Sequence, residues 1–338
     1  MAEAGYGLIG EKLGHSFSPY IHGELGGYDY RLIELERGEL GRFLKRGAFR
    51  GLNVTVPYKK DVIPYCAWLS PEARRIGSVN TIVSDGGLLR GYNTDYFGFV
   101  YMLRKAGIDV KSKKALVLGS GGASLTVQTA LHDLGAKSVT VISRGGEDNY
   151  GNLERHADAR LIVNTTPVGM FPKVEAAPLS LEIFPDCEAV ADIIYNPSRT
   201  KLLLDAEARG IPYANGLPML VAQAKVAAEL FLGRDIPDAR IDEITSVIEK
   251  RTKNIILIGM PGCGKTTVGK LLARSLGREF ADTDEIIERE GGRAIPEIFA
   301  SDGEAAFREL EHSVLAREAK KSSLVIATGG GSVLREDN

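Results

Sequence analysis

The sequence predicts an α/β protein with parallel sheets, and three patterns support this prediction. Short apolar runs alternate with stretches of helical spacing throughout the 338 residues. One glycine-rich loop, at residues 119–124, directly follows an apolar run, and a second loop, at residues 259–266, follows another such run. Such alternation is typical of strands joined by helical crossovers, and a glycine loop between strand and helix recurs in these sheets. The length predicts two or three domains.

The expected strands are the short apolar runs of the first two hundred residues. They lie at residues 32–35, 51–56, 80–83, 115–118, 138–142, 161–163 and 189–194. Helical spacing appears in Phe97, Val100 and Leu103 and again over residues 126–134. Further helical patterns and one more strand follow, at residues 217–232, 241–250 and 254–258.

The composition indicates a soluble cytoplasmic protein that acts on small molecules. Hydrophobic residues make up 44% and charged residues 25%, and the net charge of −2 provides no basic field for nucleic acid or anionic membranes. No apolar run approaches the ~18 residues of a membrane span, and residues 1–10 do not resemble a signal peptide. The three cysteines and five histidines lack disulfide or metal-ligand spacing, which favours a reducing compartment.

The first glycine loop has the G-x-G pattern of a dinucleotide-binding loop. It consists of Gly119, Ser120, Gly121, Gly122, Ala123 and Ser124. Backbone N–H groups at the start of the following helix can face a pyrophosphate. Ser124 replaces the third glycine of the pattern and is small enough for close packing of helix and strand. Because the pattern also occurs in ordinary turns, its place between a strand and a helix carries the prediction.

The end of the next expected strand indicates which dinucleotide binds. Ser143 and Arg144 stand where an NAD site usually has Asp or Glu for the ribose 2′-hydroxyl. An arginine suits a 2′-phosphate, which favours NADP(H). The alternative is a solvated surface arginine, and Glu147 and Asp148 nearby weaken the preference for NADP(H).

The second loop fits the P-loop pattern G-x-x-x-x-G-K-[ST] in full and follows the expected strand 254–258. In this motif the backbone N–H groups surround phosphates, Lys265 reaches the β and γ oxygens, and the Thr266 hydroxyl is a ligand of Mg²⁺. Cys263 occupies a variable position, either as a small filler or as a thiol near a helix start. The motif predicts that this segment binds a nucleoside triphosphate with Mg²⁺.

Small polar side chains cluster in the segments before Asp95. They occur at residues 16–18, 53–59, 79–81 and 92–95. At the carboxyl ends of strands they would face an inter-domain crevice, where α/β sheets bind ligands. Hydroxyl and amide groups suit a polyhydroxylated acid. Asn53 and Thr55 are expected on one face, because side chains alternate along a strand.

Seven motifs occur in a fixed order between about Tyr6 and Gly233. They are S-x-S at 16–18, N-V-T-V-P-Y-K at 53–59, V-N-T at 79–81, Y-N-T-D at 92–95, the first glycine loop, N-T-T-P-V-G-M at 164–170 and N-G-L-P-M-L-V-A-Q at 215–223. Together they resemble the shikimate dehydrogenase family. The resemblance implies NADPH-linked, reversible reduction of 3-dehydroshikimate to shikimate, a step in the biosynthesis of chorismate and aromatic amino acids.

The same resemblance implies roles for individual residues. Lys59 and Asp95 match the catalytic pair, and a lysine beside a carboxylate can deliver the proton that hydride transfer to a ketone requires. The alternative is a purely structural salt bridge. The matching substrate positions are Ser16, Ser18, Asn53, Thr55, Asn80, Tyr195 and Gln223. The matching cofactor positions are Gly119, Ser120, Gly121, Gly122, Ala123, Ser124, Ser143, Arg144, Thr165, Ile193, Gly216 and Met219. The chain departs from the family at residues 143–145, where Ser-Arg-Gly replaces Asn-Arg-Thr and removes one hydroxyl contact to the 2′-phosphate.

Three motifs follow the P-loop, F-A-D-T-D at 280–284, D-G-E-A-A-F-R at 302–308 and A-T-G-G-G at 327–331. With the P-loop they resemble shikimate kinase. The resemblance implies ATP contacts by Gly262, Cys263, Gly264, Lys265, Thr266 and Thr267. It implies shikimate contacts by Asp284, Arg308 and Gly330, and Mg²⁺ held by Thr266 and, through water, by Asp282. The alternatives are an exposed acidic turn at 282–284 and surface ion pairs of Arg308 with Glu304 or Glu311.

Kinases of this family extend well beyond the segment seen here, so the resemblance implies a C-terminally incomplete kinase. The missing part would carry the lid with its ATP-contacting arginine and a second arginine for the substrate carboxylate. Without those charges, transition-state charge on the phosphoryl group is poorly stabilised. The expectation is therefore weak or absent phosphoryl transfer.

The expected organisation is three domains fused without a flexible spacer. Residues 1–96 with 217–250 form an α/β substrate domain, 97–216 a Rossmann NADP-binding domain, and 251–338 a partial P-loop domain. One alternative interpretation is a quinate/shikimate dehydrogenase that uses either nicotinamide cofactor. Another is a catalytically silent ligand sensor on the same fold. Nothing in the sequence indicates an oligomeric state.

Overall fold

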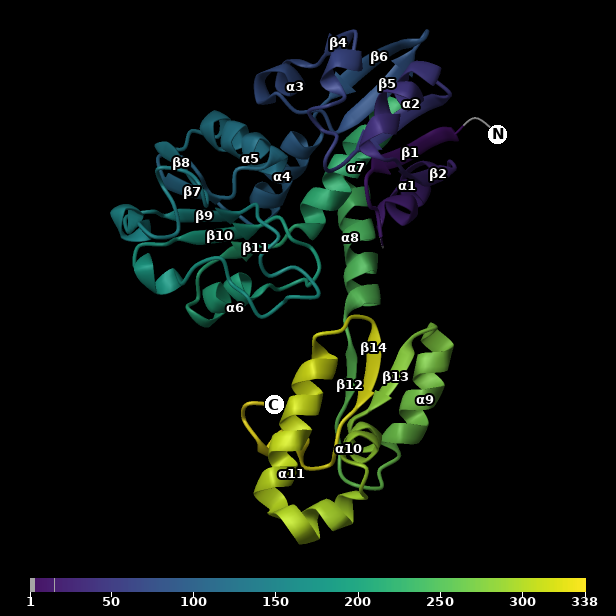
Figure 1. The fold of residues 1–338 in the computed structure, drawn as a ribbon, viewed down its shortest axis with the longest axis vertical. Coiled ribbons are helices and arrows are strands. Elements are labelled where there is room, and N and C mark those ends of the chain that lie inside the picture. Colours follow the sequence, from purple (N-terminus) through teal and green to yellow (C-terminus); the bar gives the residue numbers. More distant parts are fainter. Residues whose placement is uncertain (1–3, 15) are drawn as a thin grey trace. The chain divides into compact units, whose positions relative to one another are not determined.

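The structure of the protein is a computed structural model, which describes residues 4–14 and 16–338 (Figure 1). It divides into two compact units, Met1–Ser246 and Val247–Asn338. Both units are α/β, as predicted. The predicted boundary between residues 250 and 251 lies near the end of helix α8 (Ala239–Thr252). Residues 1–3 and His15, which entered the expectations about a signal peptide and metal ligands, lie outside the described residues.

The N-terminal part of the first unit is built on a mixed sheet. Its strands are β1 (Ala4–Gly10), β2 (Tyr30–Glu34), β3 (Phe49–Val54), β4 (Trp68–Leu69), β5 (Thr81–Asp85) and β6 (Leu88–Tyr92), in the spatial order β2-β1-β3-β5-β6-β4. The prediction of parallel sheets is wrong for β5, which is antiparallel to β3 and β6. Gly86 and Gly87 have φ of 56° and 83° and join β5 to β6 as a tight hairpin, so no crossover helix separates them.

Helices cover both faces of this sheet. They are α1 (Ser18–Gly26), α2 (Leu40–Arg46), α3 (Pro71–Ile76) and α7 (Leu217–Leu232). Tyr6, Tyr30 and Phe231 belong to an apolar cluster on the face that α7 covers. Leu44 of α2 belongs to a cluster on the opposite face. β3 and α7 approach closely because Gly51 has no side chain, and a Cβ there would lie 2.3 Å from the Phe231 ring.

The second sheet of the first unit is parallel throughout its described strands. These are β7 (Lys114–Leu118), β8 (Ser138–Ile142), β9 (Leu161–Asn164), β10 (Ala189–Asp192) and β11 (Tyr213–Ala214), in the order β11-β10-β9-β7-β8. α4 (Asp95–Lys105) and α5 (Gly122–Asp133) cover one face and α6 (Lys201–Ala208) the other. Val117 packs with the first pair of helices and Leu116 with α6, and both are fully buried. Burial on both faces explains the unbroken apolar run at 115–118.

Helices α4 and α7 pack against each other and connect the two sheets of the first unit. Gly98 of α4 permits this contact, because a Cβ there would lie 2.6 Å from the backbone oxygen of Met219. The contact fixes the first residue of α4, Asp95, relative to Gln223 of α7. Short 3₁₀ turns occur at η1 (Arg37–Glu39), η2 (Ile63–Tyr65), η3 (Leu153–His156), η4 (Leu181–Ile183) and η5 (Ser332–Leu334).

The second unit contains a parallel sheet in the order β12-β14-β13, counted over the described residues. Its elements are β12 (Ile255–Leu257), α9 (Lys265–Leu276), β13 (Glu279–Asp282), α10 (Thr283–Gly291), α11 (Ile295–Ala319) and β14 (Leu324–Ala327). α11 is kinked at Gly303, where φ is 83° and ψ is 169°. Across residues 4–14 and 16–338, no helix is both long and apolar enough to cross a membrane.

Candidate active sites

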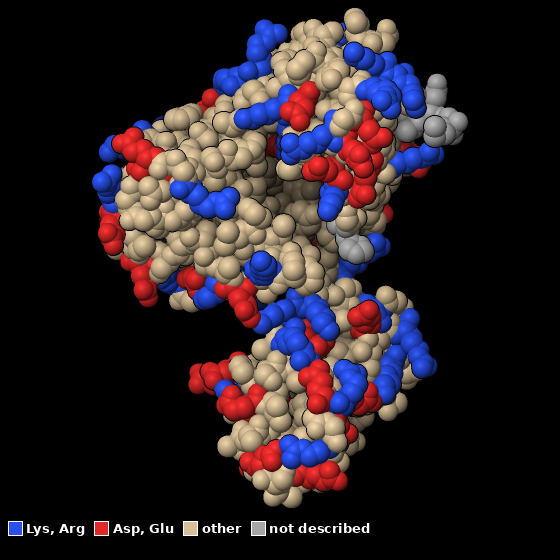
Figure 2. Space-filling view, viewed as in Figure 1, with Lys and Arg blue, Asp and Glu red and all other residues tan. Residues whose placement is uncertain are grey.

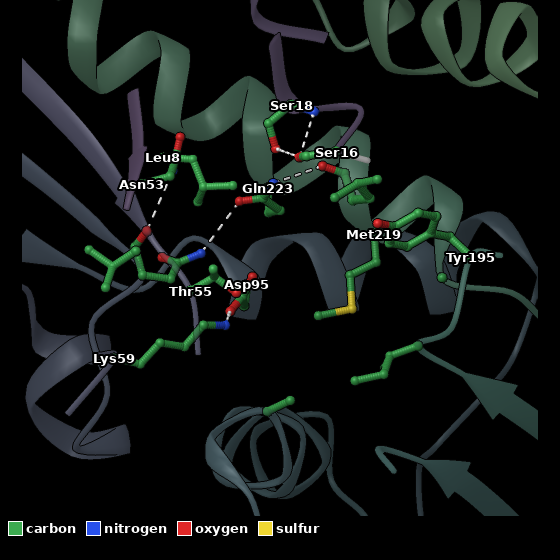
Figure 3. Close-up of a pocket in the computed structure, with 16 residues that line it drawn as sticks. Leu8, Ser16, Ser18, Asn53, Thr55, Lys59, Asp95, Tyr195, Met219 and Gln223 are labelled. Atoms are coloured by element: carbon green, nitrogen blue, oxygen red, sulfur yellow. Dashed lines mark hydrogen bonds and ion pairs between the residues drawn. The ribbon is translucent and has the colours of Figure 1, made fainter. Parts of the chain in front are cut away.

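A cavity of about 300 Å³ lies in the first unit, and Figure 3 shows the residues around it. All of the predicted substrate and catalytic residues line it, namely Ser16, Ser18, Asn53, Thr55, Lys59, Asn80, Asp95, Tyr195 and Gln223. Four predicted cofactor residues also line it, namely Ala123, Ile193, Gly216 and Met219. The face of this unit drawn in Figure 2 is hollowed, with basic and acidic side chains close to the hollow.

Lys59 and Asp95 form an ion pair at this cavity. Lys59 Nζ lies 2.6 Å from Asp95 Oδ2, and the two side chains are 18% and 12% exposed. Asp95 is the first residue of α4, where the positive end of the helix dipole favours a carboxylate. The Lys59 carbonyl accepts a hydrogen bond from Val79 N at 2.8 Å, and the neighbouring Tyr58 side chain is fully buried. The pair is therefore held from both sides.

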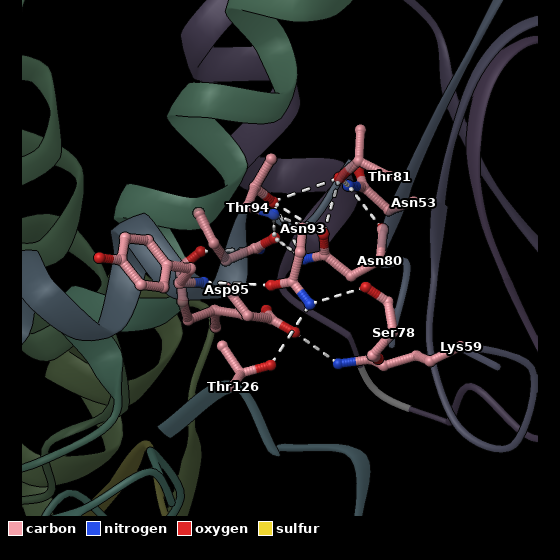
Figure 4. Close-up of polar contacts among 12 residues, drawn as sticks. Asn53, Lys59, Ser78, Asn80, Thr81, Asn93, Thr94, Asp95 and Thr126 are labelled. Atoms are coloured by element: carbon pink, nitrogen blue, oxygen red, sulfur yellow. Dashed lines mark hydrogen bonds and ion pairs between the residues drawn. The ribbon is translucent and has the colours of Figure 1, made fainter. Parts of the chain in front are cut away.

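The Asn80 amide is held by groups at the start of α4 (Figure 4). Asn80 Oδ1 accepts from Thr94 N at 2.7 Å, and Asn80 Nδ2 donates to Thr94 Oγ1 at 3.0 Å and to Gln223 Oε1 at 3.4 Å. The expectation that these polar groups all follow strand ends is wrong for Asn80, which precedes β5. Because β5 is antiparallel, its beginning lies at the same edge as the carboxyl ends of β3 and β6.

The Asn53 amide is held inside the sheet. Its Oδ1 accepts from Tyr30 OH at 2.7 Å, and its Nδ2 donates to Thr81 Oγ1 at 3.0 Å. Sequence reasoning did not assign Tyr30, Thr81 or Thr94 to the site. Thr81 and Thr94 stand inside motifs that the sequence singled out, so their position offered a signal. Tyr30 offered none, because it reaches Asn53 from β2 across β1.

Ser16, Ser18 and Tyr195 form the hydroxyl-rich side of the cavity. Ser16 Oγ donates to Ser18 Oγ at 3.1 Å and accepts from Ser18 N at 3.2 Å, at the start of α1. The Tyr195 ring meets the Phe17 ring edge-on at 6.0 Å, and burial raises the pKa of Tyr195. The cavity thus offers amide, hydroxyl, ammonium and carboxylate groups, which suits a polar ligand.

The first glycine loop lies beside the ends of three parallel strands. Gly119 has φ of 101° and donates through its N–H to Ile142 O at 2.8 Å, which places residues 143 and 144 next to the loop. Thr165 Oγ1 donates to Leu118 O at 2.6 Å on the other side. Gly121 caps α5 with no side-chain hydrogen bond, so the first N–H groups of the helix are open to an anion. Ser124 is fully buried, as expected for a close contact of helix and strand.

Arg144 is exposed and forms no ion pair with any residue that the structure describes. The acidic neighbour Asp148 is engaged elsewhere, since its Oδ1 lies 2.8 Å from His156 Nε2. The Asp148 backbone oxygen accepts from Ser143 N at 3.1 Å and so shapes the loop. Near Ile193, Gly216 leaves no space for a side chain, because a Cβ would lie 2.0 Å from the Ile193 oxygen.

In the second unit a cavity of about 330 Å³ lies over the P-loop. The predicted residues that line it are Gly262, Gly264, Lys265, Thr266, Thr267, Asp282, Asp284 and Gly330. Thr266 Oγ1 donates to Asp282 Oδ2 at 2.6 Å, and Lys265 Nζ donates to Gly259 O at 2.8 Å. Within the loop, Cys263 is exposed, with its Sγ 3.9 Å from Lys265 Nζ.

Of the predicted shikimate contacts, Asp284 lines this cavity, whereas Arg308 is not among its lining residues. Arg308 pairs with Glu311 at 2.8 Å and Glu304 at 3.3 Å, the ion pairs that the alternative interpretation anticipated. Asp284 Oδ1 is buried without a hydrogen-bond partner among the described residues. Burial, followed by the charges of Asp282 and Glu311, raises the pKa of Asp284. Within residues 4–14 and 16–338, no group of three or more His, Cys, Asp or Glu side chains could hold a metal ion. A Mg²⁺ ion at Thr266 and Asp282 would therefore also need oxygen ligands from a phosphate.

Family models match both units. The model of the shikimate dehydrogenase substrate binding domain matches residues 8–82, and that of shikimate kinase matches residues 261–338. Over 269 residues the chain is 37% identical to shikimate dehydrogenase (NADP(+)) of Clostridium beijerinckii, an alignment that covers 73% of this chain and 99% of that protein. The enzyme of the same name from Moorella thermoacetica is 37% identical over 267 residues, covering 70% of this chain and 90% of that protein.

Solved structures agree with the shikimate dehydrogenase matches. A chorismate mutase/shikimate 5-dehydrogenase fusion protein from Clostridium acetobutylicum is 38% identical, with a TM-score of 0.70 over 74% of this chain and 98% of its own. Shikimate 5-dehydrogenase from Thermus thermophilus, in complex with NADP(H) and shikimate, is 36% identical with a TM-score of 0.66 over 72% and 99%. Quinate dehydrogenase from Corynebacterium glutamicum, in complex with NAD, is 28% identical with a TM-score of 0.65 over 73% and 99%. The chain belongs to the shikimate dehydrogenase family and carries, fused to it, a segment of the shikimate kinase family.

Proposed function

We propose that the first unit catalyses the reversible, NADP(H)-dependent reduction of 3-dehydroshikimate to shikimate. The observation that carries this proposal is the Lys59–Asp95 pair in a cavity that borders the first glycine loop. A Cβ on Gly122 would lie only 3.9 Å from Lys59 Cδ, so the pair is adjacent to the loop. Relatives named shikimate dehydrogenase (NADP(+)), and one structure that contains NADP(H) and shikimate, support the choice of substrate and cofactor.

In this proposal Lys59 transfers the proton, and Asp95 holds Lys59 in place. When bound, NADPH supplies the hydride for the carbonyl carbon. Lys59 Nζ donates a proton to the carbonyl oxygen as negative charge develops on it. Asp95 Oδ2 holds the ammonium group by its 2.6 Å contact and stabilises its positive charge. In the direction of shikimate oxidation, Lys59 accepts the hydroxyl proton.

The remaining polar groups bind and orient the substrate. The amides of Asn53, Asn80 and Gln223 come from three different elements and converge on the cavity, where they can bind ring hydroxyls. Ser16 and Ser18 at the start of α1, together with the Tyr195 hydroxyl, supply donors for a carboxylate. Held at several points, the substrate carbonyl can be kept within reach of Lys59 Nζ.

The residues around the first glycine loop fit a dinucleotide with a 2′-phosphate. The uncapped start of α5 offers N–H groups to the pyrophosphate. Gly119 leaves little room for a side chain in this loop, because a Cβ there would lie 3.0 Å from Thr165 Oγ1. Arg144 lies shortly after the strand that follows the loop, and it is the cation that we expect to contact the 2′-phosphate. Asp148 Oδ1 contacts His156 Nε2 at 2.8 Å and does not pair with Arg144, so the guanidinium group remains available to a phosphate.

The direct test is the initial rate of NADP⁺ reduction with shikimate, followed by absorbance at 340 nm. We expect turnover with NADP⁺ and a lower kcat/KM with NAD⁺. A higher kcat/KM with quinate than with shikimate would favour the quinate/shikimate alternative. No turnover with either substrate and either cofactor would support the silent sensor instead.

For the second unit we propose binding of ATP with Mg²⁺, because Lys265, Thr266 and Asp282 surround one cavity in the arrangement a P-loop needs. Calorimetric titration with Mg²⁺ and ATP should show binding, and Lys265→Ala should abolish it. Lys270→Ala is the matched control, because Lys270 lies on α9 like Lys265 but outside the cavity, where it pairs with Glu285 of α10. Coupled ADP release with shikimate measures transfer, and a rate of roughly 1–100 s⁻¹ would contradict the expectation of weak or absent kinase activity.

A further inference from the structure

A backbone N–H group fixes the orientation of the Asn80 amide behind the substrate cavity. Thr94 N lies 2.7 Å from Asn80 Oδ1 and can only donate, so the atom facing it must be the amide oxygen. The Asn80 nitrogen therefore faces Thr94 Oγ1 and Gln223. Thr81 Oγ1 can donate to the same Asn80 oxygen at 3.2 Å.

The hydrogen bonds continue through Asn53 to Tyr30. Thr81 Oγ1 can give its proton to Asn80 Oδ1 or to Thr94 Oγ1, each at 3.2 Å, and with either partner its oxygen accepts from Asn53 Nδ2 at 3.0 Å. The Asn53 oxygen is then left to accept from Tyr30 OH at 2.7 Å. No other hydrogen-bond partner of Tyr30 OH occurs among the described residues, so a flipped Asn53 amide would leave the phenol proton without an acceptor.

The Tyr30 hydroxyl stays protonated and can therefore donate this hydrogen bond to Asn53. Its side chain is 7% exposed, and burial raises its pKa well above the ordinary value of 10. The His22 ring stacks on it at 4.0 Å and 7°, and His22 Nδ1 lies 2.5 Å from Tyr28 OH. Burial lowers the pKa of His22 to about 3, while its interaction with the Asn53 side chain acts in the opposite direction. Tyr30 is thus packed against neutral side chains, and among the described residues its hydroxyl has one hydrogen-bond partner, Asn53.

We propose that Tyr30 is a positioning residue for substrate binding, which holds the Asn53 amide with its nitrogen available to the cavity. The Nδ2 group uses one hydrogen for Thr81, and its other contact, to Asn80 O, is long at 3.5 Å. That second N–H serves as a donor to a hydroxyl oxygen of the substrate. This inference rests on the proposed function, since the ligand is the same small polyhydroxylated acid.

The test compares two tyrosines that are cross-strand partners. Tyr6 and Tyr30 are paired in the β1–β2 register, and both are buried in one apolar cluster. Tyr6 OH donates to Phe231 O at 3.1 Å and does not involve Asn53. Tyr30→Phe and Tyr6→Phe therefore each remove one buried hydrogen bond, but only the first releases the Asn53 amide. The melting temperatures of the two variants measure how much each substitution destabilises the folded protein.

For Tyr30→Phe we expect KM for shikimate and the calorimetric Kd for shikimate to rise about 5- to 10-fold, as for one buried hydrogen bond. The kcat and the KM for NADP⁺ should not change. Tyr6→Phe should leave all four unchanged. In an Asn53→Ala background, Tyr30→Phe should add nothing to Kd, because Tyr30 acts through Asn53.

The outcomes separate this inference from the proposed function. Equal increases in Kd for the two variants, or no increase for Tyr30→Phe, would overturn the positioning role. A further increase in the Asn53→Ala background would overturn the route through Asn53. A wild-type protein that binds shikimate but does not reduce NADP⁺ would overturn the proposed function alone, and one that binds no shikimate would overturn both.

Discussion

Lys59 Nζ and Asp95 Oδ2 lie 2.6 Å apart although their residues come from elements of different kinds. Lys59 belongs to the turn after β3, and Asp95 is the first residue of α4. The turn is held through the Lys59 carbonyl to Val79, in the segment just before β5, and α4 is held by its contact with α7. The ion pair thus sits where the mixed sheet and the helix that leads to the parallel sheet meet.

Replacing Lys59 by alanine should lower kcat for shikimate oxidation by ~100-fold or more, the scale of general acid–base catalysis. The KM for NADP⁺ should change little. Lys60→Ala is the matched control, because the neighbouring Lys60 is exposed. Steady-state kinetics of both variants provide the measurement. A near-normal kcat for Lys59→Ala would show that the pair is only a structural salt bridge.

Replacing Arg144 by alanine should raise KM for NADP⁺ about 10-fold or more, as for a charge-assisted hydrogen bond, and should leave KM for NAD⁺ unchanged. Arg160→Ala serves as the control, because Arg160 pairs with Glu188 and precedes β9 at the opposite end of the strands. The comparison is a pair of cofactor titrations at saturating shikimate. If both cofactors were affected equally, Arg144 would not read the 2′-phosphate.

The parallel sheet could be predicted from sequence because its strands are buried on both faces and read as unbroken apolar runs. β7 is the clearest case, with Ala115, Leu116, Val117 and Leu118 all fully buried. The mixed sheet was harder, because its β5–β6 hairpin depends on the turn at Gly86 and Gly87. An antiparallel strand reverses which of its ends faces the ligand, and this is why Asn80 reaches the cavity from a strand beginning.

The cavity residues could be predicted from motifs, whereas their supports could not. Lys59, Asn80 and Asp95 each stand in a short local pattern, and the structure brings them to one cavity. Tyr30 acts on Asn53 from a strand that is not its sheet neighbour, so no spacing along the chain reveals the contact. Supports of this kind depend on tertiary packing, which local patterns do not encode.

Gly98 provides a test of how the α4–α7 contact positions the site. A Cβ at this position would lie 2.6 Å from Met219 O and 3.0 Å from Gln223 Cβ, so Gly98→Ala must move α4 away from α7. We expect a loss of about 1–3 kcal/mol of stability, as for overpacking, together with a lower kcat/KM because Asp95 and Gln223 are displaced. Gly23→Ala in α1 is the control, since nothing lies within 4 Å of its Cβ. Equal stability and activity of Gly98→Ala and wild type would contradict the close contact.

The buried, neutral His22 should make stability depend on pH. Its pKa is lowered from 6.5 to about 3, so below pH 6.5 the unfolded chain binds a proton that the folded chain does not. Stability from this group is therefore complete above pH 6.5 and falls by about 1.4 kcal/mol for each pH unit below it, until the folded group titrates. Urea unfolding at pH 7 and pH 5 measures the loss. His22→Phe should show a smaller loss between these two pH values than wild type, whereas His132→Phe, which removes an exposed histidine, should not. An unchanged pH dependence in His22→Phe would mean that the imidazole is protonated in the folded protein. The conclusion that Tyr30 packs against a neutral His22 would then be wrong.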